Sequence, residues 1–132
     1  EDVGGEDSHS LVPAFNGAAA TSRTTLISHS IGGSFSMRQG DWKVCLSAGS
    51  GGWSDPREAD AKKQGLPPVQ LFNLKSDRAE QTNLLEKEPK KLKQLLALLE
   101  KEVKAGRCTP GTAVPNDRDV TFLPKGYSPD GK

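Results

Sequence analysis

Residues 24–46 have the sequence TTLISHSIGGSFSMRQGDWKVCL, and this stretch decides the fold. Its first run, residues 24–29, is β-branched and mostly apolar, which is typical of a β-strand. Residues 34–38 and 42–46 alternate polar and apolar side chains, as half-buried strands do. Turn sequences at residues 31–33 and 39–41 separate the runs. Such short connections predict an antiparallel meander of three strands.

A fourth strand is predicted at residues 69–74, VQLFNL. The connection before it, residues 48–68, is expected to be one long irregular loop. It opens with GSGGW at residues 49–53 and closes with LPP at residues 66–68. Long loops in compact domains are usually functional or disordered. This loop is therefore a candidate functional segment.

One strong helix is predicted to begin at Pro89 and to end before Gly106. Its apolar residues recur at helical spacing and form one stripe: Leu92, Leu95, Leu96, Leu99 and Val103. Its charged outer face is expected to be an ordinary solvated face. Helix and sheet can each bury an apolar side against the other. The sequence thus predicts an α+β fold, in which one long C-terminal helix packs on a small four-stranded antiparallel sheet.

The segments that flank this unit are expected to contribute less to a core. Residues 8–15 are predicted to hold one short helical turn, which Ser8 or Ser10 can cap and Gly17 can end. Residues 109–132 are rich in proline, glycine and aspartate. They predict an extended tail with a short strand at residues 120–122.

Composition bounds the functions open to the chain. Its 132 residues suffice for one modest domain. The 18 basic and 17 acidic residues give a formal net charge of +1, which predicts no nucleic-acid or anionic-lipid partner. No apolar run reaches the roughly 18–20 residues of a membrane span. The acidic start without an initiator methionine favours a fragment or a processed product.

Side chains that could carry chemistry are few. Cys45 and Cys108 could pair in an oxidising compartment, but two unpaired cysteines are the favoured interpretation. His9 is expected to be exposed, whereas His29 ends a strand at a turn, where side chains often face a cleft. No metal-ligand spacing occurs, so no metal site is expected. Residues 49–52 lack the lysine of a phosphate-binding loop.

Three segments, taken in order, carry a family resemblance. Residues 6–14, EDSHSLVPA, are similar to an Asp-x-x-Ser-Leu-Leu-Pro segment. Residues 26–43 are similar to a "His-His-Ser … Phe-Ala-Ile-Arg-x-Gly-x-Trp-Lys" hairpin, and residues 69–84 to "Leu-Tyr-Asp-Leu … Asp-Pro-x-Glu-x-x-Asn-Leu". The chain resembles, over residues 6–110, the C-terminal region of arylsulfatase-type sulfatases of the alkaline-phosphatase-like superfamily. Ser28 and Arg78 depart from the family's usual His and Pro.

The resemblance implies a division of the chain. Residues 1–22 would be a linker from an upstream catalytic domain, residues 23–107 a sulfatase-type C-terminal subdomain, and residues 108–132 an extended tail. The upstream domain would be the partner of this piece. The full-length parent would hydrolyse aryl or carbohydrate sulfates and is expected in the periplasm or outside the cell.

The resemblance also implies where the chemistry lies. Sulfatases use calcium and a formylglycine, made from Cys or Ser in a Cys/Ser-x-Pro-x-Arg signature. Both are expected upstream, so this chain should hold no cofactor, no catalytic residue and no activity of its own. Residues 108–112, CTPGT, begin like the signature. However, Thr112 stands where the required Arg should be, so Cys108 is not expected to be a nucleophile.

Loops of the small C-terminal sheet can rim the substrate cleft in this family, and the candidates here are His29, Ser30 and Trp53. Imidazole can donate a hydrogen bond to a sulfate or hydroxyl oxygen. Indole can stack on a sugar or aryl ring. Trp53 at the domain interface is the alternative, and Trp42 is expected in the core.

Two other functions stay open. One is a free-standing carbohydrate-binding or interaction module that uses the loop around Trp53. The other is a phosphoryl-transfer enzyme of the same superfamily, which an upstream Ser or Thr nucleophile would indicate.

Overall fold

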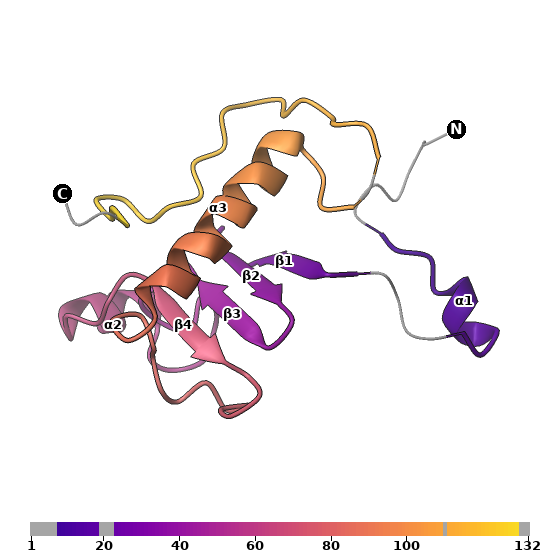
Figure 1. Cartoon of the computed structure of the whole chain (residues 1–132). Coiled ribbons are helices and arrows are strands. Elements are labelled where there is room, and N and C mark those ends of the chain that lie inside the picture. The colour runs from indigo at the N-terminus through magenta and orange to yellow at the C-terminus, as the bar shows by residue number, and fades with distance from the viewer. Residues whose placement is uncertain (1–7, 19–22, 110, 130–132) are drawn as a thin grey trace.

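The computed structural model of the protein describes residues 8–18, 23–109 and 111–129. Residues 6 and 7 of the first family-like segment, residue 110 of the CTPGT stretch and residues 130–132 of the predicted tail lie outside them. At the centre of the described chain, a four-stranded sheet lies beneath one long helix (Figure 1).

The predicted meander and the fourth strand are confirmed. The strands are β1 (Thr25–His29), β2 (Phe35–Gln39), β3 (Trp42–Cys45) and β4 (Gln70–Asn73). They form one antiparallel sheet in the order β1-β2-β3-β4. The register aligns one apolar residue from each strand into a row: Ile27, Met37, Val44 and Leu71. Because side chains alternate between the faces of a sheet, this row faces one side only.

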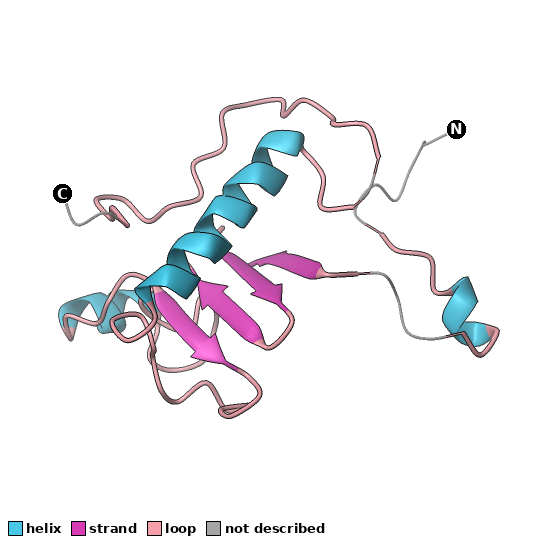
Figure 2. Ribbon diagram, viewed as in Figure 1, coloured by secondary structure: helices cyan, strands magenta, loops and turns pink. Residues whose placement is uncertain are grey.

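Helix α3 (Pro89–Ala105) covers that face of the sheet (Figure 2). It ends at Gly106, whose φ of 67° is a left-handed conformation that favours glycine. Four leucines of the predicted stripe are buried, and Val103 is partly buried. The buried core cluster consists of Met37, Val44, Leu46, Val69, Leu71, Leu92, Leu95, Leu96 and Leu99. The α+β fold is therefore confirmed.

The outer edge of β4 is covered by the chain that follows it. The side-chain oxygen of Asn83 accepts the backbone N–H of Leu71 at 3.0 Å, and its amide donates to the carbonyl of Val69 at 3.3 Å. The N–H of Leu84 donates to the carbonyl of Leu71 at 2.8 Å. These bonds satisfy backbone groups that a bare edge strand would leave unpaired.

The expectation of an irregular loop over residues 48–68 is wrong in one part, which forms α2 (Glu58–Lys63). Its sequence EADAKK contains good helix formers. Glu58 and Lys62 form an ion pair across one turn at 3.3 Å, and Ala61 is buried. Six residues are too few to show apolar periodicity, so the pattern did not predict this helix.

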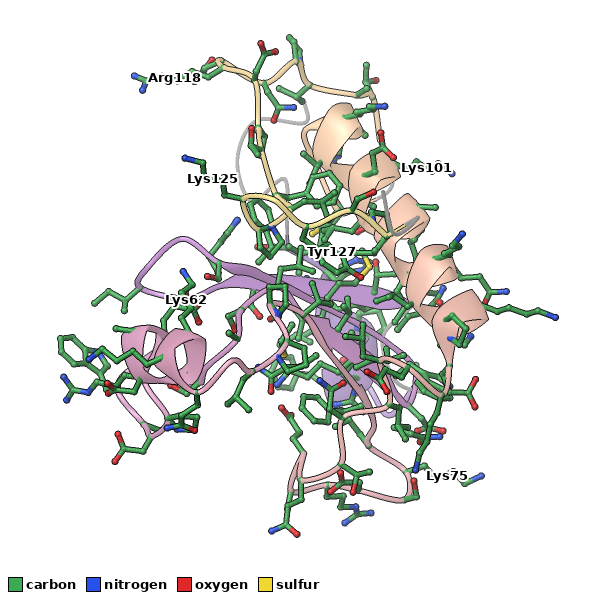
Figure 3. All side chains as sticks on the ribbon, turned by 90° about the vertical axis from the view of Figure 1, so that its left-hand side faces the viewer. Lys62, Lys75, Lys101, Arg118, Lys125 and Tyr127 are labelled. Atoms are coloured by element: carbon green, nitrogen blue, oxygen red, sulfur yellow. The ribbon has the colours of Figure 1, made fainter. Side chains whose placement is uncertain are left out.

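The predicted strand at residues 120–122 is also wrong, since these residues have no strand conformation. Phe122 instead contacts Phe35, with ring centroids 6.4 Å apart, and packs against the core together with Leu123 and Tyr127. In Figure 3, Tyr127 points toward the sheet, whereas Arg118 on the same segment points outward. The side chains of Phe122, Leu123 and Tyr127 hold the end of the tail, and nearer to α3 the N–H of Val114 donates to the carbonyl of Ala105 at 2.9 Å.

Helix α1 (Val12–Phe15) confirms the predicted helical turn and lies apart from the sheet and α3 (Figure 1). The expectation that Ser8 or Ser10 caps it is wrong, because the N-cap is Leu11, which makes no side-chain capping bond. The Ser10 hydroxyl oxygen accepts the N–H of Val12 at 3.3 Å, and Gly17 follows the helix with a φ of 76°. Phe15 is 81% exposed. None of the helices in the described ranges has the length and apolar character needed to span a bilayer.

Replacing Leu95, which is fully buried in the core, should destabilise the fold. Leu95→Ala removes apolar contacts and leaves a cavity, so it should lower the free energy of unfolding by about 2–5 kcal/mol. Urea denaturation followed by circular dichroism measures the free energy of unfolding. Leu11→Ala, at a leucine that is 53% exposed, is the matched control and should change it by less than about 0.5 kcal/mol. Equal effects would contradict the described core.

Candidate functional site

The sheet face opposite α3 carries a polar hollow. A second row of the register, Ser28, Ser36, Cys45 and Gln70, lies one residue along from the core row and so faces away from the helix. These four side chains line a hollow of about 640 Å³. Residues 29–31, 47–53 and 79–80 contribute to its walls. Its volume is in the range of ligand sites, roughly 300–1,000 Å³.

The floor of the hollow presents hydroxyl, thiol and amide groups. The hydroxyl oxygens of Ser28 and Ser36 lie 2.8 Å apart and share a hydrogen bond. Burial raises the pKa of the Cys45 thiol, and the nearby Lys43 ammonium offsets this only in part. The thiol is therefore protonated near neutral pH and is a poor nucleophile.

One ion pair stands in the wall of the hollow. Lys43 Nζ donates to both carboxylate oxygens of Glu80, at 2.7 and 2.8 Å, and both side chains are about a third exposed. Glu80 reaches this position with a φ of 54°, which is uncommon for a residue other than glycine. The hollow thus contains one cationic group that already has a carboxylate partner.

The Trp53 loop, residues 47–57, forms another wall and folds back on itself. The N–H of Ser50 donates to the carbonyl of Pro56 at 2.9 Å, and its hydroxyl donates to the carbonyl of Ser54 at 2.7 Å. Gly49 passes so close to the returning chain that a Cβ there would lie 2.6 Å from the Pro56 carbonyl oxygen. The closed shape of the loop therefore requires glycine at this position.

The three candidate residues from the sequence all line this hollow. The register places His29 and Phe35 on the same face as Ile27 and Met37, and their rings pack edge-on with centroids 4.0 Å apart. His29, at the end of β1, therefore borders this hollow and also lines a second one on the α3 side. The Ser30 hydroxyl accepts the N–H of Ser34 at 3.0 Å, so its own hydrogen is free to donate elsewhere. Trp53 is 73% exposed, with the Arg57 guanidinium 6.0 Å from its ring centre. The fold brings the candidates together, and their role in binding stays a prediction.

Other lining residues were not among the candidates. Gln70 could have been found, because a polar side chain in VQLFNL occupies an outward-facing position of the predicted strand. Lys43 could have been found in the same way. The ion pair between Lys43 and Glu80 could not be predicted from a local pattern, since the two residues lie 37 positions apart in sequence.

The described residues do not fit the metal site of a sulfatase. Within residues 8–18, 23–109 and 111–129, no group of three His, Cys, Asp or Glu side chains comes together as metal binding would require. Cys108 lines two other hollows and not this one. Cys45 and Cys108 form no disulfide bond within the described residues.

Trp42 lies on the opposite side of the sheet from the hollow. It packs partly buried against the core cluster, as predicted, and the Lys91 ammonium lies 5.7 Å from its ring centre. The two tryptophans therefore differ in surroundings, and only the exposed Trp53 borders the hollow.

Comparison with known proteins gives a structural likeness. No family model and no curated protein matches the sequence. A solved structure described as "Metabolism of multiple glycosaminoglycans by Bacteroides thetaiotaomicron is orchestrated by a versatile core genetic locus (BT33336S-sulf)" superposes with a TM-score of 0.54 at 24% identity. The match covers 72% of this chain and 19% of that one. The two chains share a fold, and this chain spans about a fifth of its neighbour.

Two glycine substitutions test whether the backbone of the Trp53 loop packs as closely at Gly49 as the structure shows. Gly49→Ala places a methyl group against backbone and should lower the free energy of unfolding by about 1–3 kcal/mol while shifting Trp53 fluorescence. Gly52→Ala is the matched control, because a Cβ there meets nothing within 4 Å. Urea denaturation and fluorescence spectra measure both variants. The described loop would be contradicted if Gly52→Ala had the larger effect.

Proposed function

We propose that this chain is the C-terminal subdomain of an arylsulfatase-type sulfatase, and that its hollow forms part of the cleft that binds the sulfate ester. The observation that carries the proposal is the convergence of His29, Ser30 and Trp53, from two separate segments, on one polar hollow. The ordered family-like segments support it. So does the fold shared with BT33336S-sulf, a sulfatase.

Each lining group has a role in this proposal. The His29 imidazole and the Ser30 hydroxyl would donate hydrogen bonds to sulfate or sugar oxygens. The exposed Trp53 indole would stack on the ring that carries the sulfate. The hydroxyl groups of Ser28 and Ser36 suit a ligand rich in hydroxyl groups, whereas the Gln70 amide already donates to the carbonyls of Ser47 and Gly49. In this proposal these groups bind and orient the ligand, and cleavage of the ester belongs to another domain.

The upstream domain would supply the chemistry of bond cleavage. A formylglycine there would serve as nucleophile, and calcium held there would neutralise the sulfate. The contribution of this chain would be to support that domain and to rim its cleft. Such an enzyme would act in the periplasm or outside the cell.

A second function is favoured by one feature of the hollow. Its volume of about 640 Å³ is in the range of ligand sites, and the exposed Trp53 borders it. The chain could therefore bind a carbohydrate as a separate module, without a catalytic partner. The two functions differ in whether the isolated chain has measurable affinity for a glycan.

The sulfatase proposal predicts a Cys/Ser-x-Pro-x-Arg signature upstream of this chain in its gene. It also predicts that the isolated chain does not hydrolyse a chromogenic aryl sulfate, even with calcium added. Sequencing the gene and a colorimetric assay check these statements. An upstream Ser or Thr nucleophile motif without the signature would indicate phosphoryl transfer instead. Turnover that survives repurification would contradict the assignment of catalysis to another domain.

Binding at the hollow should depend on Trp53. In titrations with a sulfated glycosaminoglycan oligosaccharide, Trp53→Ala should weaken binding about threefold to tenfold, because stacking on the ring is lost. Phe15→Ala is the matched control, since Phe15 is exposed and does not line the hollow. Binding by the isolated chain would favour the module. If only the full-length protein binds, the same variants are compared there by kcat/KM, and an unchanged value for Trp53→Ala would remove Trp53 from the site.

A further inference from the structure

The base of the Trp53 loop is held by two side chains from neighbouring elements. The Glu58 carboxylate, in the first turn of α2, accepts the backbone N–H of Gly49 at 2.9 Å and that of Ala48 at 3.3 Å. The Gln70 amide, on β4, donates to the carbonyls of Ser47 at 2.8 Å and Gly49 at 2.9 Å. Side chains therefore fix both the N–H and the C=O of Gly49.

Glu58 can hold the loop without touching a ligand, because it does not line the hollow. Burial raises the pKa of its carboxyl, but the N–H groups of Gly49 and Ala48 and the Lys62 ammonium outweigh this, so the pKa lies below its usual value. Glu58 is therefore charged at neutral pH. Hydrogen bonds to a charged acceptor are stronger than those between neutral groups.

We propose that Glu58 is a positioning residue, which fixes the start of the Trp53 loop and so holds the indole at the rim before a ligand arrives. This inference rests on the proposed function, in which Trp53 stacks on the ligand. Trp53 is 73% exposed, so packing does little to fix it and its position depends on the backbone of the loop. A loop that is ordered in advance loses less freedom on binding.

The first experiment measures loop order without any ligand. In Glu58→Ala, the Ala48 and Gly49 amide hydrogens should exchange about tenfold faster or more, because each loses a charged acceptor. Fluorescence anisotropy of Trp53, recorded in a Trp42→Phe background, should show a more mobile indole. Asp60→Ala is the matched control, since Asp60 lies on the same helix and pairs with Lys63 at the surface. Unchanged exchange in Glu58→Ala would overturn the proposal, whether or not the hollow binds a ligand.

The second experiment titrates a sulfated glycosaminoglycan disaccharide into the same variants by calorimetry. Glu58→Ala should raise the Kd about threefold to tenfold, and Glu58→Gln, which keeps one acceptor oxygen, should recover part of this. Glu58→Gln also preserves side-chain shape and replaces Glu58→Ala in both experiments if the latter does not fold.

A double variant separates positioning from direct contact. In a Trp53→Ala background, Glu58→Ala should cause no further loss of affinity, because it acts through Trp53. A further loss there, or an unchanged Kd despite a loosened loop, would overturn the positioning role. If the isolated chain does not bind the disaccharide, the same titrations are made with the full-length protein, and absence of binding there removes the proposed function for this ligand. The exchange rates of Ala48 and Gly49 decide in either case whether Glu58 orders the loop.

Discussion

The packing of the α3 leucines on one face of the sheet is the interaction on which the rest of the structure depends. It assigns the row through Met37 and Val44 to the core. Since side chains alternate along a strand, the same contact directs the row through Ser36 and Cys45 to the opposite face. A shift of one residue in register would exchange the two rows and bury the polar one. Core and hollow are therefore two results of one register.

Much of the fold follows from local sequence patterns. Alternation in residues 34–38 and 42–46 is a property of each strand alone, and the spacing of leucines after Pro89 is a property of one helix. The features that could not be predicted depend on partners distant in sequence. Helix α2 is too short to show a period. Phe122 packs its ring against Phe35 and forms no strand, because tertiary packing and not the local pattern sets its conformation.

The candidate site divides in the same way. Family resemblance and turn chemistry pointed to His29 and Ser30, and a glycine-rich loop with an aromatic pointed to Trp53. The sequence could not show that they share one hollow, since this depends on how the chain returns from residue 57 to β4. The contact of Glu58 with Gly49 is likewise invisible to any pattern, because a carboxylate on a helix meets a backbone amide in a loop.

The position of the Trp53 loop has a consequence for how such chains can diversify. Its outer residues, 50–56, add no side chain to the buried core cluster. Substitutions there are largely uncoupled from the packing that keeps the domain folded. Related chains could therefore exchange these residues and alter what the hollow recognises, while the leucines of α3 and the register of the sheet stay the same. The domain separates the part that evolution can vary from the part that it must keep.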